Sequence, residues 1–363
     1  TPFAGSRMRI VTDFRAFRRR GARRHLIPGV AVLLAGAWLA LAPAAGVARA
    51  YVSNEDDGTV TVVDTQRLTA LATLPVGKRP RGLVLSHDGT RLYVALSGLP
   101  KCPPPMTDED CARLPRDSQA DGIAVIDTAT LRPLATLRGV SDPERVEVSP
   151  DDRTLYVSEE DAARLAVLDV RRAIVRATVA VGREPEGVRA SADGRWVLVT
   201  SEEDNSLAIV DAHTLARHAT VSVGKRPRDI AISPDSRTAY VSGEADASVY
   251  RLALPSGAPA VRLLQLRNEA RPMGLALDSA GGRLYVSTGR GGTVAVVAIA
   301  DDRLVTEIAV GARPWGIALT ERGARLVTAN GPSGDASVVD TQSLTVIGKV
   351  STGHGPWGVV AEP

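Results

Sequence analysis

"GHGPWGVVAEP", residues 353–363, ends the chain after one strand-like segment, whereas the similar "GARPWGIALTERGARLVTANG" at 311–331 continues into a second. Both contain a turn of the form V-G-x-x-P-x-G that recurs along the sequence. The copies are "VGKRPRG" (76–82), "VGREPEG" (181–187), "VGKRPRD" (223–229), "VGARPWG" (310–316) and "TGHGPWG" (352–358), with the looser "VSDPERV" (140–146) and "NEARPMG" (268–274). Their prolines are spaced by 42 or 45 residues, apart from one gap of 63. A period of this size indicates a repeat architecture.

Each period divides into four short strands, which we call A to D. Examples of strands A and B are "DIAIS" (229–233) and "AYVS" (239–242). Examples of strands C and D, from the period before, are "SLAIVD" (206–211) and "RHATVSVG" (217–224). Runs of Val, Ile, Leu and Thr bounded by Gly, Pro, Asp and Asn are typical of strands and turns. An Asp ends strand C at 64, 127, 169, 211 and 340, and we expect its carboxylate to accept hydrogen bonds from the next turn's amides. Four antiparallel strands per repeat predict an all-β propeller.

The two ends of the chain together make up one repeat. From residue 51 the sequence starts with strands B, C and D, namely "YVSN" (51–54), "TVTVVD" (59–64) and "ALATLPV" (70–76), and it ends on a lone strand A, "GVVAE" (358–362). Closing the ring with these segments removes the exposed sheet edges. Seven prolines and the closure both predict seven blades over residues 51–363.

The first fifty residues differ from the repeats. "RAFRRRGARRH" (15–25) is cationic, "LIPGVAVLLAGAWLALAP" (26–43) is apolar, and "AGVARA" (45–50) has an A-x-A ending. This pattern predicts a signal peptide, residues 1–50, cleaved after Ala50, and hence a periplasmic or secreted protein without a membrane span in its mature form. The alternative is an uncleaved anchor, because the apolar run approaches the length of a span.

The leader also hides the charge of the rest. Residues 1–50 hold nine of the 44 basic and one of the 41 acidic side chains, so the remainder has 35 and 40, a net charge of −5. A mildly acidic protein is a poor nucleic-acid binder, since binding needs a basic face to neutralise phosphates.

The repeats resemble the YVTN family of seven-bladed propellers. The residues that carry this resemblance are "YVSN" with "TVTVVDT" (51–65), "YVSEEDAARLAVLDV" (156–170) and "YVSGEADASVYRL" (240–252). In particular the chain resembles exported bacterial members found near quinoprotein alcohol-oxidation systems. It is more distantly similar to lactonase-type propellers and to the haem d1 domain of nitrite reductase, which implies either hydrolysis or a bound cofactor.

The residues for such chemistry are sparse. Beyond the leader the histidines are His87, His213, His218 and His354, and of these only His354 is expected at a D–A turn. There is no C-x-x-C-H for haem attachment and no G-x-S-x-G elbow. We therefore predict no catalytic residues, no metal and no cofactor.

Strand alternation places the D–A and B–C turns on one face, which we call the variable face. The middle residue of each P-x-G turn enters the innermost strand, so these residues should ring the axial channel. The predicted binding residues are Arg81, Glu144, Glu186, Arg228, Met273, Trp315 and Trp357, with His354 beside them. A charged arc next to an apolar one suits a ligand with an apolar part and a polar handle. The alternatives are that the Trp rings only cover neighbouring blades and the charges are solvated, or that a divalent ion lies between Glu144 and Glu186. The acidic B–C turns are expected to be solvated loops.

The 63-residue gap contains an insert, "SGLPKCPPPMTDEDCARLPRDSQADG" (97–122), in a B–C turn. Cys102 and Cys111 are the only cysteines. In an exported protein they are expected to form a disulfide, with two free thiols as the alternative.

These observations favour an exported, monomeric, non-catalytic propeller that presents its variable face to a protein partner or a small ligand. The alternative is a lactonase-like hydrolase or a cofactor carrier that acts at the channel mouth. Fold alone does not separate the two.

Overall fold

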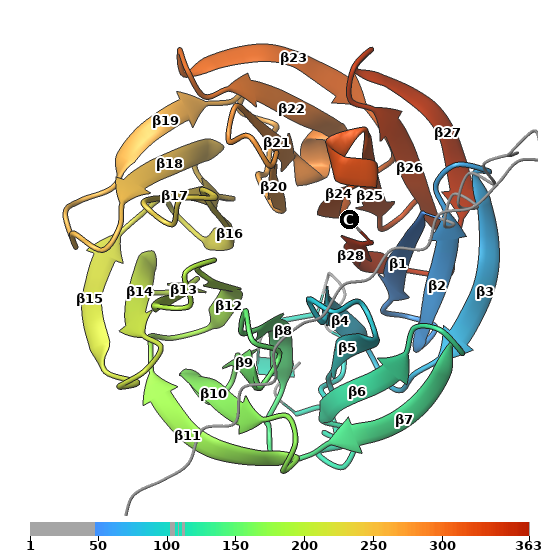
Figure 1. The fold of residues 1–363 in the computed structure, drawn as a ribbon, viewed down its shortest axis with the longest axis vertical. Coiled ribbons are helices and arrows are strands. Elements are labelled where there is room, and N and C mark those ends of the chain that lie inside the picture. Colours follow the sequence, from blue (N-terminus) through green and yellow to red (C-terminus); the bar gives the residue numbers. More distant parts are fainter. Residues whose placement is uncertain (1–47, 102–105, 108, 111–112, 363) are drawn as a thin grey trace, which may run out of the picture. The chain divides into compact units, whose positions relative to one another are not determined.

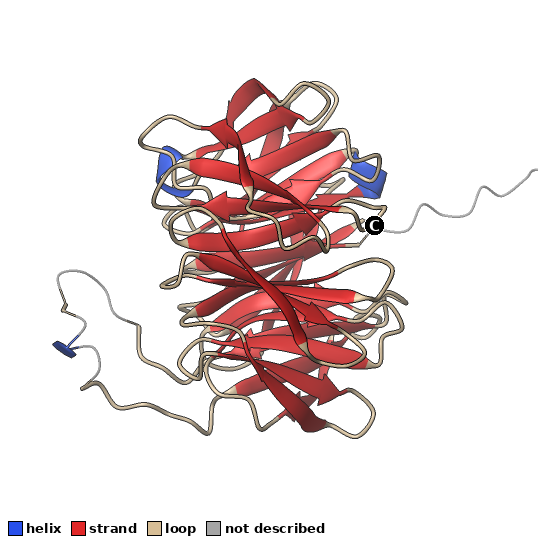
Figure 2. Ribbon diagram, turned by 90° about the vertical axis from the view of Figure 1, so that its left-hand side faces the viewer, coloured by secondary structure: helices blue, strands red, loops and turns tan. Residues whose placement is uncertain are grey.

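The computed structural model describes residues 48–101, 106–107, 109–110 and 113–362. These residues form seven four-stranded antiparallel sheets arranged as blades around a central axis, with only short helical turns between them (Figures 1 and 2). The prediction of an all-β, seven-bladed propeller is confirmed. Among the described residues, no helix is long and apolar enough to cross a membrane. Residues 1–47 of the predicted leader, together with Cys102 and Cys111, lie outside the described residues.

Each blade runs from strand A at the axis to strand D at the rim (Figure 1). Blade 1 is β28(Pro356–Ala361), β1(Arg49–Asn54), β2(Thr59–Asp64), β3(Thr69–Pro75); blade 2 is β4(Pro80–Leu85), β5(Arg91–Leu96), β6(Gly122–Asp127), β7(Arg132–Leu137); blade 3 is β8(Pro143–Val148), β9(Thr154–Glu159), β10(Arg164–Asp169), β11(Ile174–Ala180). Blade 4 is β12(Pro185–Ala190), β13(Trp196–Ser201), β14(Ser206–Asp211), β15(Arg217–Ser222); blade 5 is β16(Pro227–Ile232), β17(Thr238–Gly243), β18(Ser248–Ala253), β19(Val261–Gln265). Blade 6 is β20(Leu275–Leu277), β21(Arg283–Ser287), β22(Thr293–Ala298), β23(Arg303–Ala309); blade 7 is β24(Pro314–Thr320), β25(Arg325–Asn330), β26(Asp335–Asp340), β27(Thr345–Ser351). Two 3-10 turns, η1(Gly289–Gly291) and η2(Glu321–Gly323), complete the elements.

Blade 1 closes the ring as predicted. Strand β28 pairs with β1 in the registers Ala50↔Ala361 and Val52↔Val359. The Tyr51 hydroxyl donates a hydrogen bond to Glu362 Oε1 at 2.9 Å. Strand β1 begins at Arg49, two residues before the predicted cleavage point.

The apolar core lies between the blades, not inside them. Each of seven clusters of buried side chains draws its residues from two adjacent sheets, as where Tyr51 and Val62 of blade 1 meet Leu92 and Val94 of blade 2. A blade therefore buries its faces only against its neighbours, so the stability of each blade depends on an unbroken ring.

The Asp at the end of strand C has the structural role expected of it. Asp64 Oδ1 accepts hydrogen bonds from the amides of Gln66 and Arg67 at 2.9 and 2.8 Å. Asp211 and Asp340 bind their own turns in the same way. These carboxylates stabilise the C–D turns.

Candidate functional site

A cavity of about 550 Å³ lies on the axis at the variable face. We call it the upper cavity. Its lining residues come from D–A turns, B–C turns and the starts of strands A, which confirms that these turns share one face. Six of the eight predicted binding residues line it: Arg81, Glu144, Glu186, Arg228, Trp315 and Trp357.

The other two predicted residues do not line this cavity. Met273 is buried, because blade 6 begins its strand A later, at Leu275, and the Met273 amide donates to the Ser287 carbonyl instead. The side chain of His354 is 86% exposed, and its Nδ1 lies 2.8 Å from Asp57 Oδ1. We therefore exclude both residues from the candidate site.

The P-x-G turn aims its middle residue at the axis through a β-bulge. In blade 2 the pairing with β5 shifts register between Pro80 and Leu83, so Arg81 and Gly82 have no partner across the ladder. Such bulges re-aim side chains and bend the strand. The same shift occurs in blades 3, 4, 5 and 7.

A hydroxyl of strand B fixes the middle residue of the next blade. Ser53 Oγ donates to the Arg81 carbonyl at 2.7 Å, and Ser158 Oγ donates to the Glu186 carbonyl at 2.7 Å. Thr200, Ser242 and Ser287 do the same for Arg228, Met273 and Trp315. The recurring Y-V-S segment thus links neighbouring blades and positions the cavity wall.

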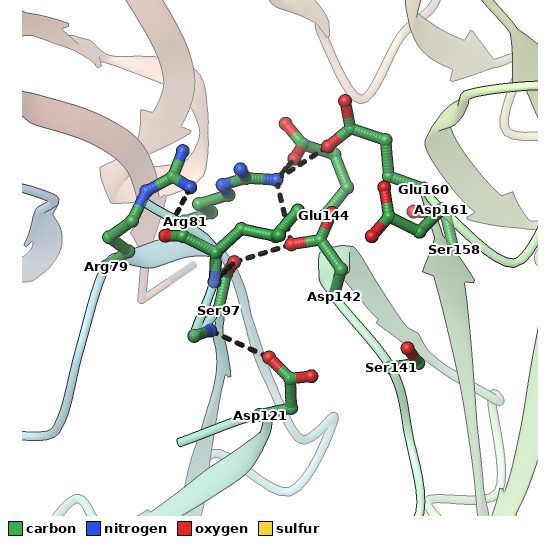
Figure 3. Close-up of polar contacts among 12 residues, drawn as sticks. Arg79, Arg81, Ser97, Asp121, Ser141, Asp142, Glu144, Ser158, Glu160 and Asp161 are labelled. Atoms are coloured by element: carbon green, nitrogen blue, oxygen red, sulfur yellow. Dashed lines mark hydrogen bonds and ion pairs between the residues drawn. The ribbon is translucent and has the colours of Figure 1, made fainter. Parts of the chain in front are cut away.

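Arg81 is the centre of one buried ion-pair network (Figure 3). Its guanidinium binds Glu144, and it donates from Nη1 to Glu160 Oε2 at 2.9 Å. Glu55 and Asp142 lie 3.7 and 3.8 Å away. Since the Arg81 side chain is only 7% exposed, the expectation of a solvated charge is wrong here.

Arg228 is the centre of a second network on the same wall. It binds Glu186, and its guanidinium nitrogens lie 2.5 Å from Glu202 Oε2 and 2.7 Å from Glu244 Oε2. Because burying a charge is costly unless it is paired, three carboxylates around one guanidinium explain how Arg228 can remain buried.

The sequence analysis missed four glutamates that complete these networks. Each is the first residue after strand B, in a turn expected to be solvated; we call them the crown glutamates: Glu55, Glu160, Glu202 and Glu244. The signal was present, because the same position is Gly289 in blade 6 and Gly331 in blade 7. Glu160, Glu202 and Glu244 occupy this position in blades 3 to 5 of the charged arc, and glycines occupy it in blades 6 and 7. Blade 1 combines Glu55 with Trp357, and blade 2 has Ser97.

Carboxyls outnumber guanidiniums on this wall, and some of them hold protons. Burial raises the pKa of Glu144 well above its usual range, despite the charge of Arg81. Burial likewise raises the pKa of Glu186 to about 8 against the opposing charge of Arg228, and that of Asp142 to about 6. At neutral pH Glu186 is therefore mostly protonated beside the Arg228 guanidinium, whereas Asp142 is mostly ionised.

The divalent ion proposed between Glu144 and Glu186 finds no support in this arrangement. Each of the two carboxyls is already bound to an arginine. The described residues contain no group of three or more His, Cys, Asp or Glu side chains that could hold a metal ion. Among the described residues, the lining also includes no His, Cys or Met that could serve as an axial ligand to haem iron.

The opposite arc is aromatic. The ring centroids of Trp315 and Trp357 are 5.6 Å apart, with the planes tilted by 45°. The Arg313 guanidinium lies over the Trp315 ring at 5.4 Å, and the Arg145 guanidinium over the Trp357 ring at 5.0 Å. Trp357 is buried, while Trp315 is half-buried. The two rings thus differ in how far a ligand in the cavity could reach them.

The fold and the cavity define the protein as a seven-bladed β-propeller with a cavity at one mouth of its channel. Two family models match parts of the chain. The cytochrome D1 heme domain matches residues 116–250, and the seven-bladed β-propeller lactonase matches residues 211–352. Comparison with curated protein sequences finds no match.

Solved structures share the fold at low sequence identity. The hydrazine synthase of Kuenenia stuttgartiensis is 19% identical with a TM-score of 0.68, over 80% of this chain and 92% of that one. The "putative 6-phosphogluconolactonase" of Bacteroides uniformis is 16% identical with a TM-score of 0.69, over 86% and 99%. Dihydro-heme d1 dehydrogenase NirN, in complex with DHE, is 17% identical with a TM-score of 0.59, over 86% and 65%. At these identities the likeness shows the fold alone.

Proposed function

We propose that this protein is a non-catalytic binding protein whose upper cavity takes a small molecule with an apolar, preferably aromatic, body and a neutral polar handle. The observation that carries the proposal is the two-sided wall, with Trp315 and Trp357 on one arc and the Arg81 and Arg228 networks on the other. Aromatic rings supply apolar contact area, and a few convergent polar groups set orientation.

The handle is neutral because the charges of Arg81 and Arg228 are already matched. Both guanidiniums are surrounded by carboxyls, so a charged handle placed against them would lose hydration without gaining a free counter-charge there. The carboxylic acid of Glu186, by contrast, can donate a hydrogen bond at neutral pH. Alcohols, amides and lactones fit this requirement.

The test is a titration of tryptophan fluorescence with an aromatic lactone, γ-phenyl-γ-butyrolactone, and with 2-phenylethanol. We expect saturable binding of both, weakened by Trp315→Ala and unaffected by Trp196→Phe, since Trp196 lies in blade 4 against His218, away from the cavity. Absence of binding by either compound would contradict the proposal.

A lactonase-like hydrolase is the second candidate, favoured by the match to the lactonase model and by the raised pKa of Glu186. A protonated carboxyl could give its proton to the leaving alkoxide while water adds to the lactone carbonyl. The described lining residues include no Ser, Cys or His to act as a nucleophile, so the attack would have to come from water. Release of acid from the lactone that disappears in Glu186→Gln would support this candidate over simple binding.

We further propose that the protein is exported and serves a quinoprotein oxidation system, on the strength of the leader and of the resemblance to YVTN proteins. Intact-mass analysis of exported protein should give a chain that starts at Tyr51. Co-purification with a quinoprotein dehydrogenase, or a gene for one next to this gene, would support the accessory role.

A further inference from the structure

A second cavity, of about 390 Å³, lies on the axis at the opposite mouth, among the A–B hairpins. We call it the lower cavity. Most of its wall is apolar and comes from strands A, with Val84, Val148, Ile232, Leu277, Ile317 and Val360 among the lining residues. Its volume is within the range of small-molecule sites.

The ceiling of the lower cavity is formed where two blades depart from the repeat. The last residue of the P-x-G turn is glycine in five blades, because neighbouring strands A approach closely there; a Cβ on Gly82 would lie 2.7 Å from Arg145 Cα. In blades 3 and 5 this position is Arg145 and Asp229. Arg145 Nη1 lies 3.7 Å from Asp229 Oδ2, across blade 4.

The other charged groups near this ceiling are saturated. Asp229 accepts hydrogen bonds from the amides of Ile230 at 2.9 Å and Leu275 at 3.0 Å. Arg189 donates to the Ile230 carbonyl and to Glu147 Oε2, both at 3.1 Å. Glu147 also accepts from the amide of Val148. These groups have little left to offer a ligand.

Arg145 is the exception. Its Nε is buried and has no hydrogen-bond partner, and no acceptor among the described residues lies within hydrogen-bond distance of its guanidinium. The contact with Asp229 is longer than a hydrogen bond, and the other neighbour is the face of Trp357. The Arg145 side chain is 16% exposed and lines the cavity, so a planar acceptor there could reach guanidinium N–H groups that have no acceptor at hydrogen-bond distance.

We infer that the lower cavity binds a small monocarboxylate with an apolar body, whose carboxylate pairs with the Arg145 guanidinium. The carboxylate oxygens match the spacing of two guanidinium N–H groups, which gives a bidentate, charge-assisted interaction. The apolar body then covers the strand A side chains. A cationic ligand is disfavoured, because Asp229 and Glu147 already accept from backbone amides.

The experiment is isothermal titration calorimetry of the full chain with sodium octanoate, compared with 1-octanol, which has the same apolar body without the charge. We expect one octanoate per chain, whereas any binding of 1-octanol, which the upper cavity can also take, should not depend on Arg145. Arg145→Met retains an apolar stem beside Trp357 and should weaken octanoate at least tenfold. Trp315→Ala, in the upper cavity, should leave octanoate binding unchanged.

The matched control is Arg153→Met, which removes the same charge from an exposed hairpin of the same blade and face. It should bind octanoate as the wild type does. If Arg145→Met does not fold, Arg145→Lys can replace it. This variant keeps the charge but loses the planar pair of N–H donors, and it should still weaken octanoate binding severalfold. The inference would be overturned if the Arg145 variants bound octanoate as tightly as the wild type, or if Arg153→Met or Trp315→Ala lost as much octanoate affinity as Arg145→Met. It would also be overturned if the wild type did not bind octanoate at millimolar concentration.

Discussion

The channel has two halves built from one repeat. In blades 2 to 5 the axial positions carry Arg81, Glu144, Glu186 and Arg228, with crown glutamates beside three of them. In blades 6, 7 and 1 they carry Met273, Trp315 and Trp357. Apart from the shorter β20 of blade 6 and the insert of blade 2, the blades share one backbone plan, so most of the difference in chemistry is set by single side chains at equivalent positions. Recognition is thus varied on a scaffold whose folding is left unchanged.

The halves also differ in what stabilises them. The aromatic half rests on packing, whereas the charged half rests on ion pairs that are stable only as complete sets. Four experiments distinguish stabilisation by packing from stabilisation by ion pairs. The first opens the ring of blades, on which both halves depend.

Deletion of residues 356–363 should have the largest effect. It removes β28, which pairs with β1 and carries Trp357, and so leaves an unpaired edge and an open ring. The truncated chain should aggregate, or melt at a much lower temperature in circular dichroism. A melting curve like that of the full-length chain would contradict ring closure.

Arg228→Met should break the charged half. Glu186, Glu202 and Glu244 would lose their common partner in a buried setting, at a cost of about 3–5 kcal/mol of unfolding free energy. Urea denaturation at pH 7 measures this. The control Arg226→Met removes a half-exposed cation from the same glutamates and should cost about 1 kcal/mol or less. Similar losses in both variants would mean that burial of the network is unimportant.

In the aromatic half, Trp357→Ala should mainly lower stability, whereas Trp315→Ala should mainly weaken ligand binding. Trp357 is buried, so truncation should cost about 3 kcal/mol through loss of packing. Trp315 is half-buried, so its loss should cost about 1 kcal/mol and act mainly on ligand binding. Thermal melts and fluorescence titrations of the two variants separate these roles; the reverse order of stabilities would contradict the division.

The charged half should contribute a distinct part of the pH dependence of stability. The pKa of Glu186 is raised to about 8 in the folded state, so the folded chain holds a proton that the unfolded chain releases. That contribution is complete below the unfolded pKa and is lost as the pH rises through about 8, with a limiting slope of about 1.4 kcal/mol per pH unit per proton. Glu186→Gln should flatten the decline in urea stability between pH 5 and 8, and Trp315→Ala should not. If the slope of unfolding free energy against pH is unchanged in Glu186→Gln, Glu186 is not the group responsible for it.

The fold could be predicted from the sequence because its determinants are local and repeated. The P-x-G turn, the strand runs and the two partial repeats at the chain ends give the blade number and the closure directly. The six cavity residues followed from the same register, since a turn position fixes which side of the strand a side chain occupies.

The rest of the site depends on contacts between blades. The sequence places Glu160 in an acidic turn, but only the bend of that turn toward the axis brings it to Arg81, 79 residues away. Met273 does not line the cavity because it precedes β20, which starts only at Leu275, and the D–A loop before it is two residues longer than the other regular D–A loops. His354 does not line the cavity as predicted, because Asp57, in a neighbouring turn, holds its side chain outside the cavity. These outcomes are set by tertiary distances that a periodic pattern does not encode.

The closure through β1 and β28 has a consequence for how the chain folds. Six blades form from contiguous sequence, but blade 1 requires segments from opposite ends, as in the Tyr51–Glu362 hydrogen bond that spans 311 positions. This non-local step is slow by nature, because the entropy of closing so long a loop is lost before any native contact compensates it. During synthesis the first three strands must wait, unpaired at their inner edge, until the last residues emerge. Completion of the ring is therefore a step that requires β28 to have been made.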